Sequence, residues 1–354
     1  MKTIPVYLKE RSYNVIISSG CFRNEAASRI SELVSQKEKI AIVSDENVWE
    51  LYGNSLLIEL ERKGFSCFPA IIRPGESSKD MQSLGRILDI FAQKGLGRGG
   101  LVVALGGGVA CDVAGFAAAC WMRGVHYMQI PTSLLAMVTS SVGGNTAIDI
   151  PAGKNLIGAF HQPSLVIVDP ALLATLPHKE FSIGMAEVIR YGAIQSKILF
   201  NNIESTRYEV YTPELIDIIT DCIRIKTKIV SGDELDSGRR ELLNFGHTFG
   251  HAIELKYGYF RYPHGMAVVE GMHISALYGE SAGITGPGTA ERLEAIFREY
   301  GLECKESADN LYYYVKQDKK VLGDALKLVL LKEIGKAEIF EIPLTEIEEQ
   351  LEEI

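Results

Sequence analysis

The first half of the chain alternates short β-rich runs with stretches of helical periodicity. The candidate strands are residues Ile4–Leu8, Lys39–Val43, Cys67–Ile71, Leu101–Leu105, His126–Ile130 and Leu165–Val168. Helical stretches such as Asp80–Lys94 lie between them. Strands that are joined through helices pair in parallel, since each connection crosses back over the sheet. We therefore expect an α/β fold with a mostly parallel sheet and helices on both of its faces.

The second half of the chain has a different pattern. After Pro177 long helical stretches follow at Phe181–Gln195, Pro213–Ser231, Leu242–Tyr257 and Gly265–Ser281. Residues Leu326–Leu331 and Ala337–Ile342 predict one late β-hairpin within this helical half. A chain of 354 residues exceeds one ordinary hydrophobic core. We expect two domains, an α/β domain at residues 1–175 and a mainly α-helical domain at residues 176–354.

Composition excludes several classes of protein. The net charge of −9 argues against general nucleic-acid binding, although local basic clusters can still bind a small anion. Six scattered cysteines without a Cys-x-x-Cys pair indicate reduced thiols and a cytoplasmic protein. The N-terminus lacks the apolar core of a signal peptide. Gly106, Gly107, Gly108 and Asp112 interrupt the apolar run Leu101–Met122, so a strand, turn and helix explain it better than a membrane span.

That run carries the first candidate binding site. A buried strand leads into Gly106, Gly107 and Gly108, and a helix follows. Glycines let the backbone approach a phosphate closely, and a helix N-terminus offers free N–H groups with positive dipole character. The alternative is a tight structural turn. In an earlier segment of the chain, Glu76 and Lys79 could bind ribose hydroxyls, although that segment alone indicates only a turn.

Three histidines within eighteen residues form the second candidate site. His247 and His251 are four residues apart, which places both rings on one face of a helix, and His264 follows. Imidazole suits Zn, Co and Fe, and histidines beside a carboxylate are typical of a catalytic metal site. Glu187, inside an apolar helical stretch, is the best carboxylate donor, because a metal would remove the cost of burying it. The alternative is a set of satisfied structural histidines.

Several cations stand beside motif-like segments and could bind an anionic substrate. They are Arg123, Lys154, Lys226, Arg240 and the pair Lys319–Lys320. Any one of them alone would be read as a solvated surface charge. Their value depends on their meeting at the predicted metal site.

Taken in order, the motifs resemble those of the 3-dehydroquinate synthase family of sugar-phosphate cyclases over nearly the whole chain. The matching segments are Gly106-Gly-Gly-Val-Ala-Cys-Asp112, Arg123-Gly-Val125, Pro131-Thr-Ser-Leu-Leu-Ala136, Ser140-Ser-Val-Gly-Gly144, Gly153-Lys-Asn-Leu-Ile-Gly-Ala-Phe160, Ala186-Glu-Val-Ile189, Leu243-Asn-Phe-Gly-His-Thr-Phe-Gly-His-Ala-Ile-Glu254 and Asp318-Lys-Lys320. The resemblance implies a Rossmann-like N-terminal domain, a helical C-terminal domain, bound NAD, a divalent metal (Zn or Co) and a homodimer.

The resemblance also assigns roles to residues. It implies that Glu187, His247 and His264 bind the metal and that His251 is a proton-transfer group, which replaces the reading of His251 as a ligand. The implied NAD contacts are Asp45, Asn47, Glu76, Lys79, Gly107, Gly108, Asp112, Thr132, Ser133 and Thr175. The implied carboxylate-binding residues of the substrate site are Lys226 and Arg240. The implied phosphate-binding residues are Asn155, Asn244, Lys319 or Lys320, and Arg123 reaching across the dimer. Lys154 and Arg190 complete the implied substrate and catalytic residues, together with His251.

The implied activity is a redox-neutral lyase reaction. NAD oxidises a secondary alcohol of 3-deoxy-D-arabino-heptulosonate 7-phosphate, phosphate is eliminated, the hydride returns, and an intramolecular aldol step closes the ring of 3-dehydroquinate. This reaction belongs to the shikimate pathway of aromatic amino acid biosynthesis. The protein would mainly orient the reactants and hold the developing charge.

Four positions depart from the family pattern. Thr139 and Asn145 replace an Asp and a Lys that face the substrate, Arg190 replaces a Lys, and Met266 replaces a Glu. The first two changes remove one charge of each sign, so the local net charge is kept. Because Lys226 and Arg240 remain, an acidic substrate is still favoured, and the hydroxyl-binding part of the site is what the changes alter.

Three other functions compete with this one. A sister cyclase would act on a differently substituted or aminated sugar phosphate. A metal- and NAD-dependent polyol dehydrogenase would have no use for phosphate-binding and carboxylate-binding residues. A silent paralogue would act only as a dimeric binding or regulatory protein, against which the predicted metal residues and glycine turn argue.

Overall fold

The structure is a computed structural model that describes residues 1–236, 238–258, 262–317 and 321–354. The chain forms two compact units: unit 1 is Met1–Phe181 with Val210–Leu235, and unit 2 is Ser182–Glu209 with Asp236–Ile354. The first break is close to the expected boundary at residues 175/176, whereas the helix within Val210–Leu235 lies beyond that boundary and packs in unit 1.

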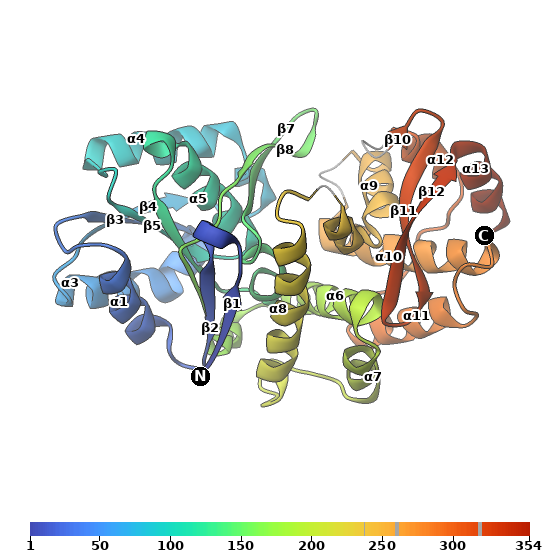
Figure 1. The fold of residues 1–354 in the computed structure, drawn as a ribbon, viewed down its shortest axis with the longest axis horizontal. Helices are drawn as coiled ribbons and strands as arrows, with labels where there is room; N and C mark the ends of the chain where they lie inside the picture. Colours follow the sequence, from blue (N-terminus) through green and yellow to red (C-terminus); the bar gives the residue numbers. More distant parts are fainter. Residues whose placement is uncertain (237, 259–261, 318–320) are drawn as a thin grey trace. The chain divides into compact units, whose positions relative to one another are not determined.

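Unit 1 is built on a seven-stranded sheet in the order β1-β2-β9-β6-β5-β3-β4 (Figure 1). The strands are β1 (Lys2–Val6), β2 (Tyr13–Ile17), β3 (Lys39–Asp45), β4 (Ser66–Ile72), β5 (Leu101–Gly106), β6 (His126–Pro131) and β9 (Leu165–Val168). Strand β1 pairs antiparallel with β2, and the other neighbours in this sheet pair in parallel. The expected α/β, Rossmann-like fold of this half is confirmed.

The central strands are the most apolar part of the sequence because both of their faces are covered. Every residue of β5 and β9 is buried. Helices α1 (Phe22–Leu33), α3 (Asn54–Arg62), α4 (Met81–Lys94) and α5 (Gly108–Cys120) connect the strands. Figure 1 shows α4 and α5 on one side of the sheet and α1 and α3 on the other, the two-sided cover expected of such a sheet.

Several parts of unit 1 differ from the expected elements. Strand β2 was not predicted, and β1 begins two residues before the expected strand. The hairpin of β7 (Asn145–Ile150) and β8 (Gly153–Phe160) was also missed; it forms a separate two-stranded sheet that packs on α5. Short helical turns fill the connections: η1 (Lys9–Arg11), α2 (Glu46–Val48), η2 (Trp49–Gly53), η3 (Glu76–Ser78), η4 (Trp121–Arg123), η5 (Ala136–Ser140) and η6 (Pro170–Thr175). Helix α8 (Leu215–Gly232) packs against β1 and η5, which explains its place in unit 1.

Unit 2 is mainly helical, as expected. Its elements are α6 (His178–Gln195), whose first turn lies in unit 1, then α7 (Lys197–Ser205), η7 (Arg239–Asn244), α9 (His247–Lys256), α10 (His264–Ser281), α11 (Thr289–Glu299), α12 (Tyr312–Val315) and α13 (Leu344–Glu353). The predicted late hairpin is present as β11 (Ala325–Glu333) and β12 (Lys336–Pro343), with β10 (Val321–Leu322) added at its edge. Buried side chains of α9, α10 and β11, such as Phe249, Tyr278 and Leu330, share one core.

One predicted helix needs correction. The stretch Leu242–Tyr257 is not one helix, because Gly246 has a φ of 82° and separates η7 from α9. A side chain at Gly246 would also collide with Met272, its Cβ lying 2.4 Å from the Met272 Cγ atom. At Gly271 a Cβ would lie 1.9 Å from the Gly246 carbonyl oxygen. The close crossing of α9 and α10, which brings the histidines together, therefore depends on glycine at both positions.

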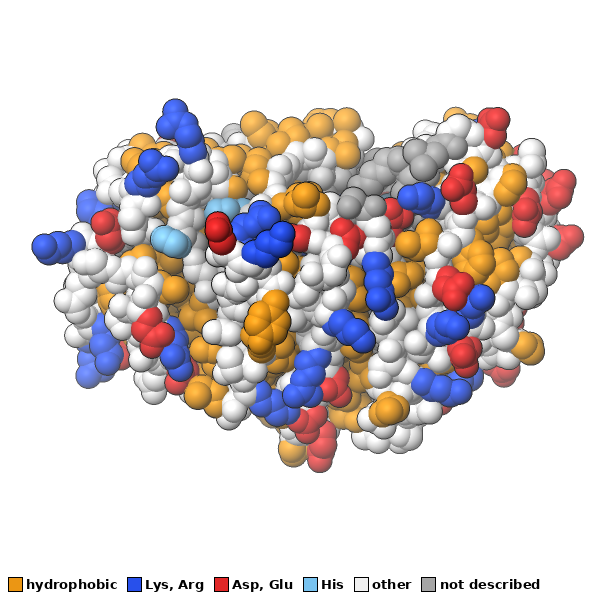
Figure 2. Space-filling view, in the orientation of Figure 1, with side chains coloured by type: hydrophobic (Ala, Val, Ile, Leu, Met, Phe, Trp, Pro, Cys, Tyr) orange, Lys and Arg blue, Asp and Glu red, His pale blue; other side chains and the backbone are white. Residues whose placement is uncertain are grey.

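Two features of the described residues bear on the predicted partners. No helix among them combines the length and apolar character that a bilayer span demands. On the face shown in Figure 2, the basic side chains are interspersed with acidic ones. Such mixing differs from the clustered basic surface that nucleic-acid binding uses.

Candidate functional site

The carboxyl ends of four parallel strands in unit 1 gather the predicted NAD contacts. In the sheet register Asp45 pairs with Ile72, and Gly106 pairs with Pro131. The residues that follow these strands therefore meet at one edge, and the Thr132 N–H donates to the Gly106 carbonyl oxygen at 2.9 Å. Open α/β sheets bind ligands at this edge.

The glycine turn has the geometry expected from the sequence. Strand β5 ends at Gly106, and α5 begins at Gly108 with no side chain capping its N-terminus. Its first N–H groups therefore point out of the helix without a side-chain acceptor at the cap. Gly107 and Ser133 are neighbours here, since a Cβ on Gly107 would lie 3.5 Å from the Ser133 hydroxyl. This turn can hold a phosphate by its backbone.

A buried ion pair lies beside the turn. The Lys79 ammonium is 2.6 Å from the Asp112 carboxylate, with side chains only 7% and 17% exposed. Burial lowers the pKa of Lys79, but the carboxylates of Asp112 and Glu76 outweigh it and the pKa is raised. Lys79 is therefore a cation at neutral pH, and the structure brings three of the predicted NAD contacts together.

The β7–β8 hairpin brings two predicted substrate residues close to this pair. Lys154 Nζ is 3.9 Å from the Glu76 carboxylate. The Asn155 N–H donates to Asp149 Oδ1 at 2.8 Å, and the Asp149 N–H donates to the Lys79 carbonyl oxygen at 2.7 Å. Asp149, which the sequence patterns did not mark as a site residue, therefore ties the hairpin turn to the Lys79 segment.

Other predicted NAD contacts are more dispersed. Asn47 is exposed on α2, whose N-terminus is capped by Asp45. Thr175 is exposed at the end of η6 and its hydroxyl lies 2.6 Å from that of Tyr52. All of the assigned NAD contacts stay predictions.

Lys226 is a buried cation of unit 1. It is 5% exposed on α8, and its ammonium donates to the Thr139 carbonyl oxygen of η5. This bond fixes the lysine beside one of the positions where the sequence departs from the family pattern. Asn145, the other such position in unit 1, is exposed at the start of β7.

In unit 2 the three predicted histidines form one cluster. The ring centroids of His247 and His251 are 5.7 Å apart, those of His247 and His264 are 5.9 Å apart, and those of His251 and His264 are 6.2 Å apart. Two imidazoles on one Zn ion, at metal–nitrogen distances of about 2.1 Å, have centroids roughly 5–6 Å apart. The spacing fits a metal with either His251 or His264 beside His247, so the role of His251 stays a prediction.

Hydrogen bonds orient two of these rings. His264 Nδ1 is 3.1 Å from the carboxylate of Glu254, which is fully buried. His247 Nδ1 is 3.4 Å from the Phe245 carbonyl oxygen. Acceptors at Nδ1 leave Nε2 as the nitrogen that can bind a metal, a common arrangement around zinc. The sequence prediction missed Glu254, because its contact with His264 is made between α9 and α10 and not within one helix.

Glu187 is held by a different partner. It is buried on α6, and Arg190, one turn further along the helix, donates to its carboxylate. Among the described residues, no three or more His, Cys, Asp or Glu side chains already stand in a metal-binding arrangement. The donor types fit a divalent metal, and completing the set requires Glu187 to share or leave Arg190.

The remaining predicted residues lie in three places. Arg240 is 1% exposed on η7, which ends at Asn244, and the Leu243 carbonyl between them accepts from Arg190. Arg123 is exposed beyond the C-terminal end of α5, about 20 Å along that helix from the glycine turn. The chain itself therefore does not bring Arg123 to the turn. Lys319 and Lys320 lie outside the described residues.

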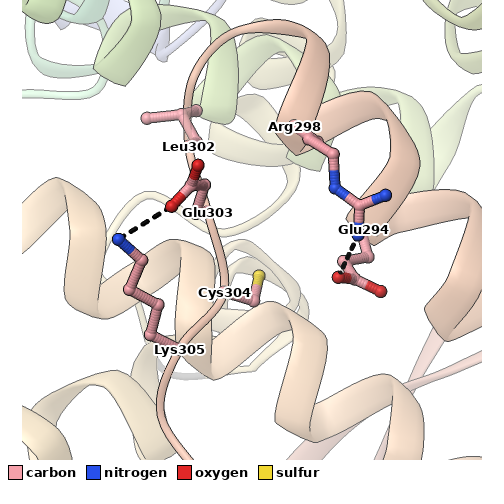
Figure 3. Close-up of a pocket in the computed structure, with 6 residues that line it drawn as sticks. All are labelled: Glu294, Arg298, Leu302, Glu303, Cys304 and Lys305. Atoms are coloured by element: carbon pink, nitrogen blue, oxygen red, sulfur yellow. Dashed lines mark hydrogen bonds and ion pairs between the residues drawn. The ribbon is translucent and has the colours of Figure 1, made fainter.

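A pocket of about 170 Å³ lies elsewhere in unit 2 and contains none of the predicted residues. Figure 3 shows its charged side chains in two pairs, Arg298 with Glu294 at 2.6 Å and Lys305 with Glu303 at 2.7 Å. Burial raises the pKa of the Cys304 thiol in this pocket to about 12, so the thiol stays protonated at neutral pH. Paired charges and an unreactive thiol indicate a structural feature.

Comparisons with known proteins cover the whole chain. The family model described as 3-dehydroquinate synthase N-terminal matches residues 69–183, and the model described as 3-dehydroquinate synthase C-terminal matches residues 184–321. A 3-dehydroquinate synthase of Prochlorococcus marinus (strain MIT 9215) is 40% identical over 348 residues, which is 96% of each chain.

Solved structures share the fold. A 2-epi-5-epi-valiolone synthase from Streptomyces hygroscopicus subsp. jinggangensis 5008, solved with NAD+ and Zn2+, is 26% identical with a TM-score of 0.87 over 98% of each chain. A 2-deoxy-scyllo-inosose synthase complexed with carbaglucose-6-phosphate, NAD+ and Co2+ is 23% identical with a TM-score of 0.85 over 99% of each chain. The 40% identity to the curated relative and the two family models agree with the sequence motifs, and this chain belongs to the 3-dehydroquinate synthase family.

Proposed function

We propose that this chain is a 3-dehydroquinate synthase, a lyase that eliminates phosphate from 3-deoxy-D-arabino-heptulosonate 7-phosphate and closes the ring of 3-dehydroquinate in the shikimate pathway. The observation that carries the proposal is the cluster of His247, His251 and His264 in a chain that also has a phosphate-binding turn. The curated relative with full-length identity supports this substrate.

NAD is the proposed cofactor of unit 1. The strand edge with Asp45, Gly107 and Thr132 has the form of a dinucleotide site, and two solved structures of similar fold carry NAD+. Glu76, Lys79 and Asp112 would bind beside it. The raised pKa of Lys79 keeps a cation next to the dinucleotide.

A divalent metal, Zn or Co, is the proposed second cofactor, and the same two structures carry these ions. Glu187, His247 and His264 would hold it, with Glu254 fixing the His264 ring. When bound, the dinucleotide would supply reversible hydride transfer with the substrate alcohol, and the metal held by Glu187, His247 and His264 would supply Lewis-acid polarisation of that alcohol.

The chain's own side chains would bind the substrate and move its protons. Lys226 and Arg240 are buried cations suited to a carboxylate. His251 would take or return a proton within the histidine cluster. The family resemblance assigns the phosphate to Asn155, Asn244 and one of Lys319 and Lys320, and it counts Lys154 and Arg190 among the substrate residues. Removal of either buried cation should raise KM, because a buried charge on the substrate would lose its partner.

A homodimer in the cytoplasm is part of this proposal. Arg123 is exposed, and it would complete the substrate-phosphate site of a partner subunit, as the family resemblance implies. Leu156 and Phe160 on β8 are 49% and 42% exposed, which supports an apolar contact there. The free cysteines fit a reducing compartment. Light scattering during gel filtration tests the dimer, and a monomeric mass would contradict it.

A sister cyclase activity is the second candidate function. The side chains of Thr139 and Asn145 are neutral where the family motif has charged ones. The Thr139 carbonyl oxygen also accepts a hydrogen bond from the Lys226 ammonium. Loss of a charged hydrogen-bonding partner costs about 1.5–3 kcal/mol, which is large enough to change which hydroxyl pattern is accepted.

The test is a phosphate-release assay on 3-deoxy-D-arabino-heptulosonate 7-phosphate with NAD and Co2+ or Zn2+. It compares the wild type with the double variant Thr139→Asp/Asn145→Lys. Robust wild-type turnover to 3-dehydroquinate is the expected result. A silent wild type with an active double variant would mean that the natural substrate is another sugar phosphate.

A further inference from the structure

Arg190 is a cation enclosed by unit 2. Only 2% of its surface is exposed. One terminal nitrogen donates to the Glu187 carboxylate and the other donates to the Leu243 carbonyl oxygen of η7. Its Nε atom is buried and has no hydrogen-bond partner among the described residues. A buried guanidinium needs a negative partner, and Glu187 supplies it.

The same carboxylate is needed by the metal. A divalent ion bound to Glu187 would place two further positive charges close to the guanidinium, and repulsion is strong where water is excluded. Metal binding must therefore work against an existing ion pair. The histidines carry no such cost, because their Nδ1 partners, Glu254 and the Phe245 carbonyl, favour the metal-bound orientation.

We propose that Arg190 is a positioning residue that competes with the metal for Glu187 and so sets the metal affinity of the site. The inference rests on the proposed metal-dependent function. In the metal-free chain Arg190 holds the buried Glu187 carboxylate in place on α6. In the metal-bound chain it shares that carboxylate, so the metal is held more weakly than it would be beside a neutral side chain.

The test measures Co2+ affinity by chelator competition on the full-length, metal-stripped protein, without substrate or turnover. Arg190→Met removes the charge and keeps an unbranched side chain. It should bind Co2+ about ten- to a hundred-fold more tightly, the range that corresponds to loss of one charged hydrogen-bonding partner. Arg190→Lys keeps the charge but cannot serve Glu187 and Leu243 together in the same geometry, and should lie between the two.

Arg298→Met is the matched control. Arg298 also follows a glutamate on one helix face, Glu294, but their side chains are 68% and 35% exposed and neither residue belongs to the predicted metal set. Its Co2+ affinity should equal that of the wild type. If Arg190→Met folds poorly without metal, its melting temperature should rise more on Co2+ addition than that of the wild type.

Two different results would overturn the inference, and they distinguish its own failure from failure of the proposed metal site. Unchanged or weaker Co2+ binding by both Arg190 variants, with normal binding by the wild type, would show that Arg190 only supports the fold. Absence of Co2+ binding by the wild type and by every variant would overturn the proposed metal site and this inference with it.

Discussion

The two candidate sites differ in how their charges are paired. In unit 1 the Lys79 ammonium and the Asp112 carboxylate satisfy each other, and the backbone turn beside them is set by the sheet register. In unit 2 the Glu187 carboxylate is paired with Arg190, which is not part of the predicted metal set. The glycine turn of unit 1 is shaped by the backbone, so it can form before its ligand binds. The metal site of unit 2 is built from side chains of α6, α9 and α10, so Glu187 must exchange or share its partner Arg190 when a metal binds.

Replacement of His264 by Ala should have the largest effect and should be confined to unit 2. Even partners that only orient a ligand are worth about ten- to a hundred-fold in metal affinity, so loss of a ligand itself should exceed about a hundred-fold. Isothermal titration with Co2+ measures this loss, and NAD affinity measured in parallel should be unchanged. Co2+ binding that matches the wild type would exclude His264 as a ligand.

Replacement of Lys79 by Met should affect unit 1 instead. Removing one partner of a buried ion pair costs about 3–5 kcal/mol of unfolding free energy. Both tryptophans, Trp49 and Trp121, belong to unit 1, so their fluorescence during urea unfolding reports on that unit.

Arg62→Met, which removes a more exposed pair with Glu59 in the same unit, is the control for this variant and should leave the unfolding free energy almost unchanged. Lys79→Met should also weaken NAD binding and leave Co2+ binding intact. Equal stability of the Lys79 and Arg62 variants would contradict the proposed contribution of the buried Lys79–Asp112 pair to the stability of unit 1.

Replacement of Glu254 by Gln tests the oriented half of the metal site. The amide keeps the size of the side chain but removes the charge that faces His264 Nδ1. Metal affinity should fall about ten-fold, at the lower end of the range for such partners. A loss as large as that of the His264 variant would instead indicate that the fold of α9 and α10 depends on Glu254.

The smallest effect concerns pH and lies outside both sites. Burial lowers the pKa of His161 from 6.5, and its ring stacks on Tyr127. Below pH 6.5 the unfolded chain therefore binds more protons than the folded one, and stability falls as the pH drops toward the lowered folded-state pKa. His161→Gln should make that fall shallower in urea unfolding at several pH values. An unchanged slope would assign the pH dependence to other groups.

Much of the fold follows from local sequence patterns. The buried runs of β5 and β9 and the late hairpin are recognisable because apolar and β-branched residues stand between turn residues. Strand β2 was missed because Tyr13–Ile17 follows the helical turn η1 closely. The helix predicted over Leu242–Tyr257 was wrong at its start because the break depends on the αL conformation of Gly246.

The sequence predicted which residue types form the candidate metal site, but it did not predict which side chains contact one another there. His247 and His251 are neighbours by helical spacing alone. The Arg190–Glu187 pair also has helical spacing, three residues, and was readable in principle. The contact of Glu254 with His264 depends on the crossing of α9 and α10, which is tertiary and which no local pattern encodes.

The central claim is that the chain is a lyase that uses NAD without consuming it. The direct measurement supplies 3-deoxy-D-arabino-heptulosonate 7-phosphate in large excess over NAD, with Co2+ present, and follows phosphate release together with NADH fluorescence. We predict many phosphates released for each NAD, 3-dehydroquinate as the product and no lasting rise in NADH. Stoichiometric NADH without phosphate would contradict the claim and indicate a dehydrogenase.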